Sequence, residues 1–218
     1  MLKIIILIFS TFLESILMII KNVVVGSLEV NCYIIGCDET KEAAIIDPGD
    51  NADEIIKIIE KEGLKPKFII NTHAHFDHIG GVKEIQDHFI IEFNLHEGDL
   101  FLVENASEQA TSFGLKPISK PVVNKYVNNG DEISLGNMTI TVIHTPGHSP
   151  GCVCYYSDNN VFVGDTLFAD SIGRTDLPGG SHEALINSVK EKLFPLGDNT
   201  IVHPGHGPST TIGNEKKH

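Results

Sequence analysis

The chain has 218 residues, of which 41% are hydrophobic, and it carries a formal net charge of -13 at pH 7. This length and composition describe a folded globular protein with one sizeable core and exclude an intrinsically disordered chain. The acidic balance argues against nucleic acid, and against an anionic membrane surface, as the main partner, so we expect no nucleic-acid partner.

The first twenty residues form an apolar N-terminal extension, which we set apart from a single domain over residues 21–218. Glu14 interrupts the apolar run, and no small-residue cleavage pattern follows it. Even without Glu14 the run would barely span a bilayer. We therefore expect an upstream start that is not always used, with a cleaved signal or a membrane anchor as alternatives, and no firm membrane association. Met18 would begin the first strand naturally.

The first half of the chain predicts short antiparallel strands followed by alternating strands and helices. Val, Ile, Tyr and Phe are concentrated in the strands, and Gly, Asn and Asp separate them. The expected strands lie at 23–25, 32–35, 43–46, 68–70 and 90–95. The expected helices lie at 52–62, 79–87 and 98–103. The first of these helices places its isoleucines on one face, with Lys and Glu opposite.

The second half predicts mainly strands. Residues 104–122 show no clear period and contain two prolines, so we expect a long surface excursion there. Ser181 is a good N-cap for a helix to about residue 193. The expected strands lie at 131–135, 138–144, 152–156, 161–163 and 200–202.

A run of three histidines and an aspartate follows the expected strand at 68–70. In an extended segment alternate side chains share a face, so His73 and His75 can point at one ion together. A turn at Asp77, a good N-cap residue, would let Asp77 and His78 reach a second ion. Burying these groups without partners would be costly, and a metal supplies a partner. The alternative is a chance cluster of surface histidines.

Three further strand ends carry side chains of the same type, namely His148, Asp165 and His206. Each lies next to Gly, Pro or other turn residues, and such loops on a rigid scaffold are where sites are built. Histidine nitrogen and carboxylate oxygen without cysteine suit zinc, iron or manganese. The four cysteines, by contrast, are expected to be packing residues.

The ordered set of motifs resembles the metallo-β-lactamase superfamily, and within it the glyoxalase II-like hydrolases. Residues 73–78 match its His-x-His-x-Asp-His motif, and the other matches are Thr-Pro-Gly-His-Ser-Pro-Gly at 145–151, Gly-Asp-Thr at 164–166 and Pro-Gly-His-Gly at 204–207. The resemblance covers roughly residues 23–208. It implies an α/β (α+β) fold, a four-layer αββα sandwich with two mixed sheets packed face to face and helices outside.

The resemblance also implies a ligand set for two divalent metal ions. One ion is held by His73, His75 and His148, the other by Asp77, His78 and His206, and Asp165 bridges both. Zinc is the expected metal, with iron or manganese as alternatives. Two cations about 3.5–4 Å apart can share a water, lower its pKa and provide the attacking hydroxide. Asp77 is the candidate catalytic residue because its carboxylate could orient that nucleophile.

The resulting functional prediction is a cytoplasmic thioester hydrolase that cleaves S-lactoylglutathione or a related small-molecule thioester. Asp165 weakens a true β-lactamase assignment, since the common zinc β-lactamases place a cysteine there. Only residues 208–218 follow the motif of the last ligand, whereas typical glyoxalase II enzymes add a helical domain that helps bind glutathione. The substrate is therefore expected to be a different or more loosely held thioester. The native metal and the oligomeric state stay open.

Two alternative functions remain. Residues 173–176, Gly-Arg-Thr-Asp, also resemble persulfide dioxygenases, which use one iron in the same site. A non-catalytic metal-binding regulator is the third candidate. Arg174 is expected to pair with a carboxylate behind the ligands, or else with an anionic substrate. Asp47 could hydrogen-bond a ligand imidazole or simply end its strand, and His144 and His203 could orient ligands.

Overall fold

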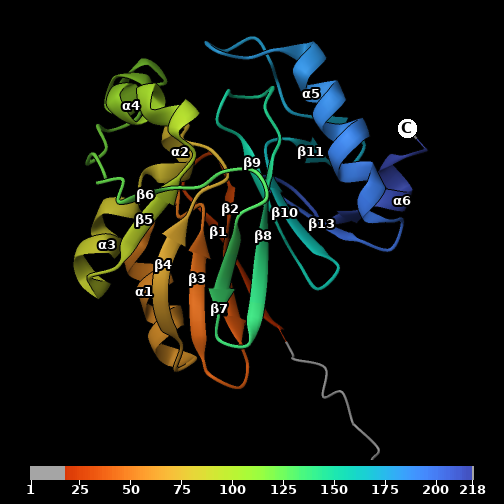
Figure 1. Cartoon of the computed structure of the whole chain (residues 1–218). Helices are drawn as coiled ribbons and strands as arrows, with labels where there is room; N and C mark the ends of the chain where they lie inside the picture. The colour runs from red at the N-terminus through yellow and green to blue at the C-terminus, as the bar shows by residue number, and fades with distance from the viewer. Residues whose placement is uncertain (1–17, 218) are drawn as a thin grey trace, which may run out of the picture.

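The computed structural model describes residues 18–217, in which two six-stranded mixed sheets pack face to face (Figure 1). The first sheet has the order β1 (Met18–Val25), β2 (Val30–Cys37), β3 (Glu42–Ile46), β4 (Lys65–Ile70), β5 (Glu92–Leu95) and β6 (Lys125–Tyr126). The second has the order β14 (Thr210–Thr211), β13 (Ile201–Pro204), β10 (Asn160–Gly164), β9 (Val153–Ser157), β8 (Met138–His144) and β7 (Glu132–Leu135). A separate hairpin is formed by β11 (Leu167–Phe168) and β12 (Ser171–Ile172).

Helices cover the outer faces of both sheets (Figure 1). The helices beside the first sheet are α1 (Ala52–Lys61), α2 (Phe76–Ile79), α3 (Val82–Phe89) and α4 (Leu100–Ser112). Those beside the second sheet are α5 (His182–Ser188), continued by a π-helical turn (Val189–Leu193), and α6 (Ile212–Glu215). Short 3-10 turns occur at Glu97–Asp99 and Phe194–Leu196. The predicted four-layer αββα sandwich is thus confirmed.

The side chains of β2 point alternately to the two faces of the first sheet and so belong to two different cores. Cys32 and Ile34 pack in the core beneath the helices of the first sheet, whereas Tyr33 and Ile35 pack in the core between the two sheets. Successive strand residues point to opposite faces, so a strand buried on both sides is apolar at nearly every position. A third core lies beneath α5 and α6 and includes Val161 and Val163 of β10.

Strand direction brings several loops to one edge of the sandwich. β3, β4 and β5 run parallel in the first sheet, and β10 runs parallel to β13 in the second. Parallel strands place their carboxyl ends at the same edge, and binding sites in α/β folds are commonly built there. The histidine-bearing and aspartate-bearing loops predicted from the sequence follow four of the strands, β4, β8, β10 and β13.

Two predicted segments have a different secondary structure over part of their length. The surface excursion expected from residue 104 is helical as far as Ser112, because α4 buries Ala106 and Ala110 against the first core. In the second half of this helix, residues 104–112, these two alanines are the only apolar residues, and they give a weak periodic signal, which explains the error. Ile90 does not begin a strand: it ends α3 in the left-handed region, with φ 56°, and its side chain is 91% exposed.

The first strand begins at Met18, whereas the predicted domain begins at residue 21. Met18, Ile19 and Ile20 pair with Cys37, Gly36 and Ile35 in β1, which agrees with Met18 as the natural start of the strand. The remaining residues of the proposed extension lie outside the described part of the chain, so their role stays a prediction. Within residues 18–217, no helix is both long and apolar enough to cross a bilayer.

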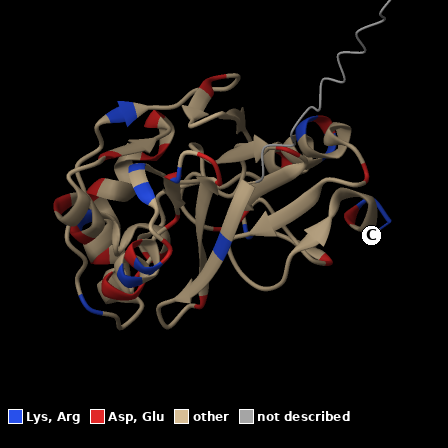
Figure 2. Ribbon diagram, turned by 90° about the horizontal axis from the view of Figure 1, so that it is seen from below, with Lys and Arg blue, Asp and Glu red and all other residues tan. Residues whose placement is uncertain are grey.

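Charged residues of both signs are interspersed over the outer helices and loops of the described chain (Figure 2). Surface pairs account for many of the basic residues, for example Lys21 with Glu62 and Lys125 with Glu92. Exposed pairs of this kind contribute little to the free energy of unfolding. The stability of the fold therefore comes mainly from the three apolar cores.

Candidate metal centre

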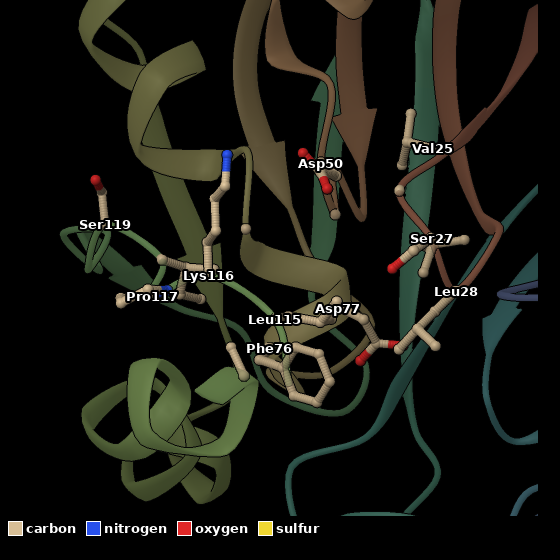
Figure 3. A pocket seen from close by; sticks show the side chains of 16 residues that line it. Val25, Ser27, Leu28, Asp50, Phe76, Asp77, Leu115, Lys116, Pro117 and Ser119 are labelled. Carbon is tan, nitrogen blue, oxygen red and sulfur yellow. The ribbon is translucent and has the colours of Figure 1, made fainter. Parts of the chain in front are cut away.

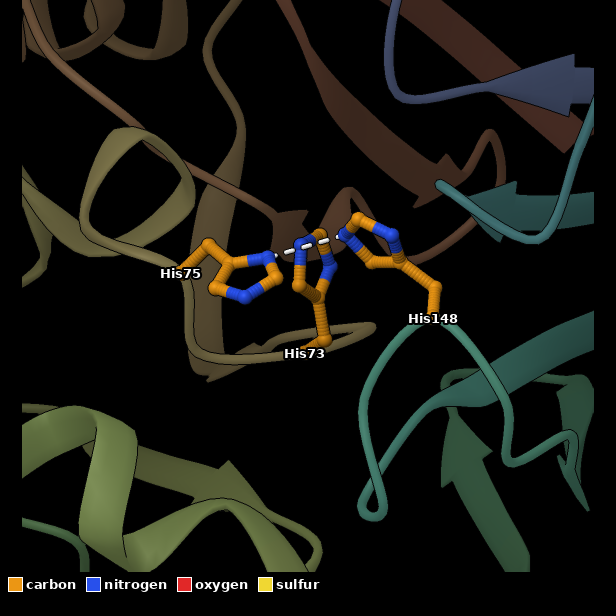
Figure 4. A group of neighbouring side chains, drawn as sticks. All are labelled: His73, His75 and His148. Atoms are coloured by element: carbon orange, nitrogen blue, oxygen red, sulfur yellow. Dashed lines mark hydrogen bonds between the residues drawn. The ribbon is translucent and has the colours of Figure 1, made fainter. Parts of the chain in front are cut away.

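Three imidazoles converge from two loops at the carboxyl edge of the sheets (Figure 4). His73 and His75 follow β4, and His148 lies in the loop between β8 and β9. Nδ1 of His75 lies 2.8 Å from Nε2 of His148, and the ring of His73 lies 4.8 Å from both of the other rings. All three are buried, and one ring nitrogen of each lies within 4.8 Å of the others. The geometry fits a three-histidine cation site.

A second triad forms beside the first from Asp77, His78 and His206. Asp77 and His78 lie in α2, and His206 follows β13. The turn expected at Asp77 is present, but it is helical, and its N-cap is His75, so Asp77 lies within the helix. Nε2 of His206 lies 3.5 Å, and Nε2 of His78 3.8 Å, from Oδ2 of Asp77. The helical turn therefore directs Asp77 and His78 to a different point from His73 and His75.

Asp165 lies between the two triads, immediately after β10. Its Oδ1 is 3.4 Å from Nε2 of His78, and its Oδ2 is 3.6 Å from Nε2 of both His148 and His206. One carboxylate thus contacts both groups, as a bridging ligand must. The structure brings together all seven residues singled out from the sequence.

Buried polar atoms test whether a metal fits this site. Nε2 of His73 and of His78, and Oδ1 of Asp165, are buried without a hydrogen-bond partner in the described chain. Such orphaned groups are rare in folded proteins and require an explanation. Gly205 leaves room beside them, since a Cβ there would lie 2.3 Å from Oδ1 of Asp165 and 2.8 Å from Cε1 of His78. Divalent cations would satisfy these orphaned atoms.

The protonation of the first triad suits metal binding. Burial, reinforced by the neighbouring imidazoles, lowers the pKa of His73 well below its ordinary value. The same causes lower the pKa of His75 to about 3. Both rings are therefore neutral near pH 7, and a neutral imidazole is the form that offers a lone pair to a metal.

The second triad is dominated by negative charge. Burial alone would lower the pKa of His78, but the carboxylates around it, beginning with Asp165 and Asp77, raise that pKa to about 10. Burial likewise opposes the charge of His206, while Asp77 and Asp165 raise its pKa. In the absence of ions, protons thus balance these carboxylates. Bound cations would take the place of these protons, which would be released on metal binding.

Asp47 supports two of the candidate ligands from behind. Oδ1 accepts a hydrogen bond from the backbone N–H of Thr72 (2.7 Å), and Oδ2 contacts the Thr72 hydroxyl (2.5 Å) and Nδ1 of His78 (3.1 Å). The Thr72 hydroxyl also contacts Nδ1 of His73 (3.1 Å). Asp47, His73 and His78 could themselves group around an ion. Because both oxygens of Asp47 are already engaged, we assign it to orienting the imidazoles.

Substitution of Asp47 by Asn should weaken metal binding about 10- to 100-fold, the range usual for residues that orient ligands. The amide would place a donor against the Thr72 hydroxyl or its backbone N–H. The measurement is metal affinity by competition with a chromogenic chelator. Asp50→Asn, an exposed substitution three residues away, is the matched control for folding and metal content. Equal metal affinity in the D47N variant and the wild type would contradict the assigned role.

Backbone carbonyls orient two further imidazoles. Nδ1 of His148 lies 2.7 Å from the carbonyl oxygen of Arg174, and Nδ1 of His206 lies 2.9 Å from that of Leu28. The guanidinium of Arg174 pairs at the surface with Asp176, with N···O distances of 2.7 and 2.8 Å. The expectation that it pairs with a carboxylate behind the ligands was wrong, because its carboxylate partner is the exposed Asp176, two residues away in the sequence.

Asp99 was not singled out from the sequence. It is fully buried and accepts hydrogen bonds from the backbone N–H of Ala74 (3.1 Å), the Ser149 hydroxyl (2.7 Å) and the backbone N–H of Gly151 (2.7 Å). Burial raises the pKa of Asp99, although these donors oppose the shift. Asp99 therefore joins the loop of His73 and His75 to the loop of His148. No sequence motif marks it.

Two histidines proposed to orient ligands have other partners. His144 stacks on His96 with ring centroids 4.2 Å apart, and its Nε2 contacts the carbonyl of Pro150 (2.9 Å). His203 contacts Oδ1 of Asn160 (2.9 Å) through Nε2. His144 thus supports the loop that carries His148, and the hydrogen bonds of His203 lie away from the triads.

Comparison with known protein families and sequences gives matches over most of the chain. The model of the Metallo-beta-lactamase superfamily matches residues 25–206. The hydroxyacylglutathione hydrolase GloC of Haemophilus influenzae is 41% identical over 202 residues, which cover 91% of this chain and 95% of that protein.

Solved structures give similar agreement. The B3 metallo-beta-lactamase BLEG-1 has a TM-score of 0.86 and 41% identity, covering 92% of this chain and 97% of that one. TTHA1623, solved in a di-iron-bound form, has a TM-score of 0.83 and 40% identity, covering 90% of this chain and 97% of that one. The same fold thus occurs with two metal ions in a similar protein.

Proposed function

Because the chain belongs to the metallo-beta-lactamase superfamily and is a metallo-hydrolase, we propose that it cleaves a thioester of the glyoxalase II type, such as S-lactoylglutathione. The observation that carries the proposal is Asp165 in contact with two triads of candidate ligands. The similarity to GloC over nearly the whole of both chains supports the choice of substrate class.

The ligand set fits two divalent ions, with His73, His75 and His148 around one, Asp77, His78 and His206 around the other, and Asp165 between them. Ions bound there would supply Lewis acidity, which lowers the pKa of water and polarises a carbonyl. We retain zinc as the proposed metal, and the di-iron form of TTHA1623 supports iron as the alternative.

The remaining chemistry is assigned to residues of the chain. The His78 and His206 imidazoles lower the pKa of Asp77 below its ordinary range, against the effect of burial, so its carboxylate is ionised and can accept a hydrogen bond from an attacking water. We propose that Asp77 orients this nucleophile. The neutral rings of His73 and His75 add no negative charge, which preserves the positive field at the carbonyl.

A cavity of about 400 Å³ opens over the two triads. Besides candidate ligands, its lining is largely apolar and includes Leu28, Phe76, Phe113, Phe168 and Leu177. Apolar walls exclude water and strengthen electrostatic interactions with the reacting carbonyl. The lining therefore favours a substrate whose scissile bond lies near apolar groups. A thioester, with its weakly polar sulfur, meets this requirement.

One observation favours a second candidate function. BLEG-1 is named a B3 metallo-beta-lactamase and is as identical to this chain as GloC is. The cyclic amide of a β-lactam is also opened by water at a carbonyl, so the same centre could serve that reaction. The thioester is preferred because Asp165 occupies the position where the resemblance places cysteine in the common zinc β-lactamases.

Removal of metal from the purified protein should lower the rate of thioester hydrolysis more than about 100-fold. This loss exceeds the loss of about 10- to 100-fold that is usual when a residue that orients a metal ligand is substituted. The test measures metal content by mass spectrometry and hydrolysis of S-lactoylglutathione without oxygen, before and after chelation and again after zinc or iron is restored. We expect two metals per chain, anaerobic turnover, and faster cleavage of the thioester than of a penicillin.

Three outcomes would contradict the proposal in different ways. Faster opening of the penicillin would favour the β-lactamase function. One iron per chain, with turnover only of glutathione persulfide and only with oxygen, would favour the dioxygenase. A metal-loaded protein without any turnover would favour a metal-binding regulator. A cytoplasmic location remains a separate prediction.

A further inference from the structure

A second cavity, of about 530 Å³, adjoins the cavity over the metal centre (Figure 3). The two share Leu28, Phe76 and Asp77 in their linings, so the second cavity begins at a candidate metal ligand. Its walls come from the turn between β1 and β2, the loop after β3, helix α2 and residues 115–119. Its volume lies within the range of about 300–1,000 Å³ usual for small-molecule sites.

Lys116 is the only basic residue among those that line this cavity. The other charged side chains of the lining are Asp50 and Asp77. The ammonium group of Lys116 takes part in none of the ion pairs of the described chain, whereas Lys120, four residues later, pairs with Glu104. A protein with net charge -13 offers many acidic partners, so an unpaired lysine beside the active cavity is a candidate for binding an anionic ligand.

The segment that carries Lys116 is anchored on both sides. Leu115 and Ile118 pack against the core beneath the helices, and the backbone N–H of Leu115 donates to the carbonyl of Ala110 at the end of α4 (3.0 Å). Pro117 follows Lys116 directly and fixes its own φ near the value of an extended chain. The backbone that presents Lys116 is thereby positioned before a ligand arrives, which reduces the entropy lost on binding.

The two cavities differ in the charged residues that line them. The first holds the candidate ligands, apolar walls and Arg174, whose guanidinium is paired with Asp176, whereas the second extends from Asp77 past apolar residues to Asp50 and the unpaired Lys116 (Figure 3). A thioester has two arms that leave the scissile bond in different directions. One arm can therefore lie within each cavity while the carbonyl sits at the metal centre.

We propose that the second cavity binds the arm of the substrate that carries a carboxylate, with Lys116 as the group that receives it. This inference rests on the proposed thioester hydrolysis and specifies its substrate class, a thioester with an anionic arm. The carboxylate can belong to the thiol arm, as in a cysteine-containing peptide, or to the acyl arm, as in a dicarboxylic acid. Lys116 acts in specificity, because it lies outside the two ligand triads.

The test compares three thioesters on metal-loaded protein. S-acetylglutathione carries its carboxylates on the thiol arm, S-succinyl-N-acetylcysteamine carries one on the acyl arm, and S-acetyl-N-acetylcysteamine carries none. We take the kcat/KM of each anionic thioester and divide it by the kcat/KM of the neutral thioester. If the anionic arm of that substrate enters the cavity, Lys116→Ala should lower this ratio about 10-fold, mainly by raising KM for the anionic thioester. Lys116→Glu should lower the ratio further, and Lys116→Arg should restore most of it.

Lys120→Ala is the matched control, because Lys120 lies on the same segment but outside the lining. It should leave the ratio unchanged. If the Lys116 variants lower the ratio for the glutathione thioester, the thiol arm occupies the second cavity. If they lower the ratio for the succinyl thioester, the acyl arm occupies it. If neither ratio responds to K116A or K116E, the inference is wrong.

A binding measurement separates this inference from the proposed function. S-methylglutathione and S-methyl-3-mercaptopropionate, thioethers that cannot be hydrolysed, are titrated calorimetrically into wild type and K116E. Tighter binding of either to the wild type than to K116E would support an anion-binding cavity even if no thioester were hydrolysed. Equal affinities for both, together with normal hydrolysis, would refute the role of Lys116 and leave the proposed function standing.

Discussion

Replacing Asp165 by Asn should reduce hydrolysis by more than about 100-fold and leave fewer than two metals per chain. Substituting a residue that merely orients a ligand costs about 10- to 100-fold, and Asp165 contacts both triads directly. An amide oxygen lacks the negative charge that balances two neighbouring cations, and its NH₂ group would point at imidazole nitrogens or metal. The measurements are kcat/KM on S-lactoylglutathione and metal content by mass spectrometry.

Asp158→Asn provides the control for this experiment. Asp158 lies in the exposed turn between β9 and β10, with φ 46°, a conformation that asparagine also tolerates. The same chemical change at this position should leave both measurements unaltered. An Asp165→Asn protein that kept two metals and more than a tenth of the wild-type rate would show that Asp165 is not a bridging ligand.

Replacing Asp99 by Asn should lower the free energy of unfolding by about 2 kcal/mol and hydrolysis by about 10- to 100-fold. The buried carboxylate accepts three hydrogen bonds. The NH₂ group of an asparagine would face at least one of the three groups that donate them, so that two donors would oppose each other. Ala74 lies between His73 and His75, and Ser149 follows His148. Loss of Asp99 should therefore loosen the first triad as well as the fold.

Two measurements distinguish positioning from a purely structural role. Urea denaturation gives the free energy of unfolding, and chelator competition at a temperature where the variant is folded gives metal affinity. Asp131→Asn is the matched control, since Asp131 accepts a backbone hydrogen bond from Asn128 in an exposed turn. A folded Asp99→Asn protein with wild-type metal affinity would limit Asp99 to stabilising the loops.

The candidate ligands could be identified from the sequence because their chemistry is concentrated and local. His73 to His78 lie within one short run, and the resemblance located His148, Asp165 and His206 from the residues next to them. The layered fold was predicted through the same resemblance, and the burial of β2 along its whole length agrees with it. Asp47 was recognised as a candidate partner of a ligand imidazole, with a role in ending its strand as the alternative.

The remaining features depend on contacts that a single sequence does not specify. Asp99 is identified only by its burial and by three donors that approach from two distant loops. The pairing of Arg174 with Asp176 depends on the local turn rather than on the motif. Lys116 gains its importance from the cavity, which forms only when β1, β2 and α2 come together with the segment after α4.

The hydrogen bond between His148 and the carbonyl oxygen of Arg174 bears on how this protein could diversify. Every amino acid supplies that carbonyl, so natural variation or a directed-evolution library could exchange the side chain at position 174 without removing the acceptor. This side chain also lines the cavity above the centre. New selectivity is therefore accessible there in single mutational steps, with the reaction chemistry retained.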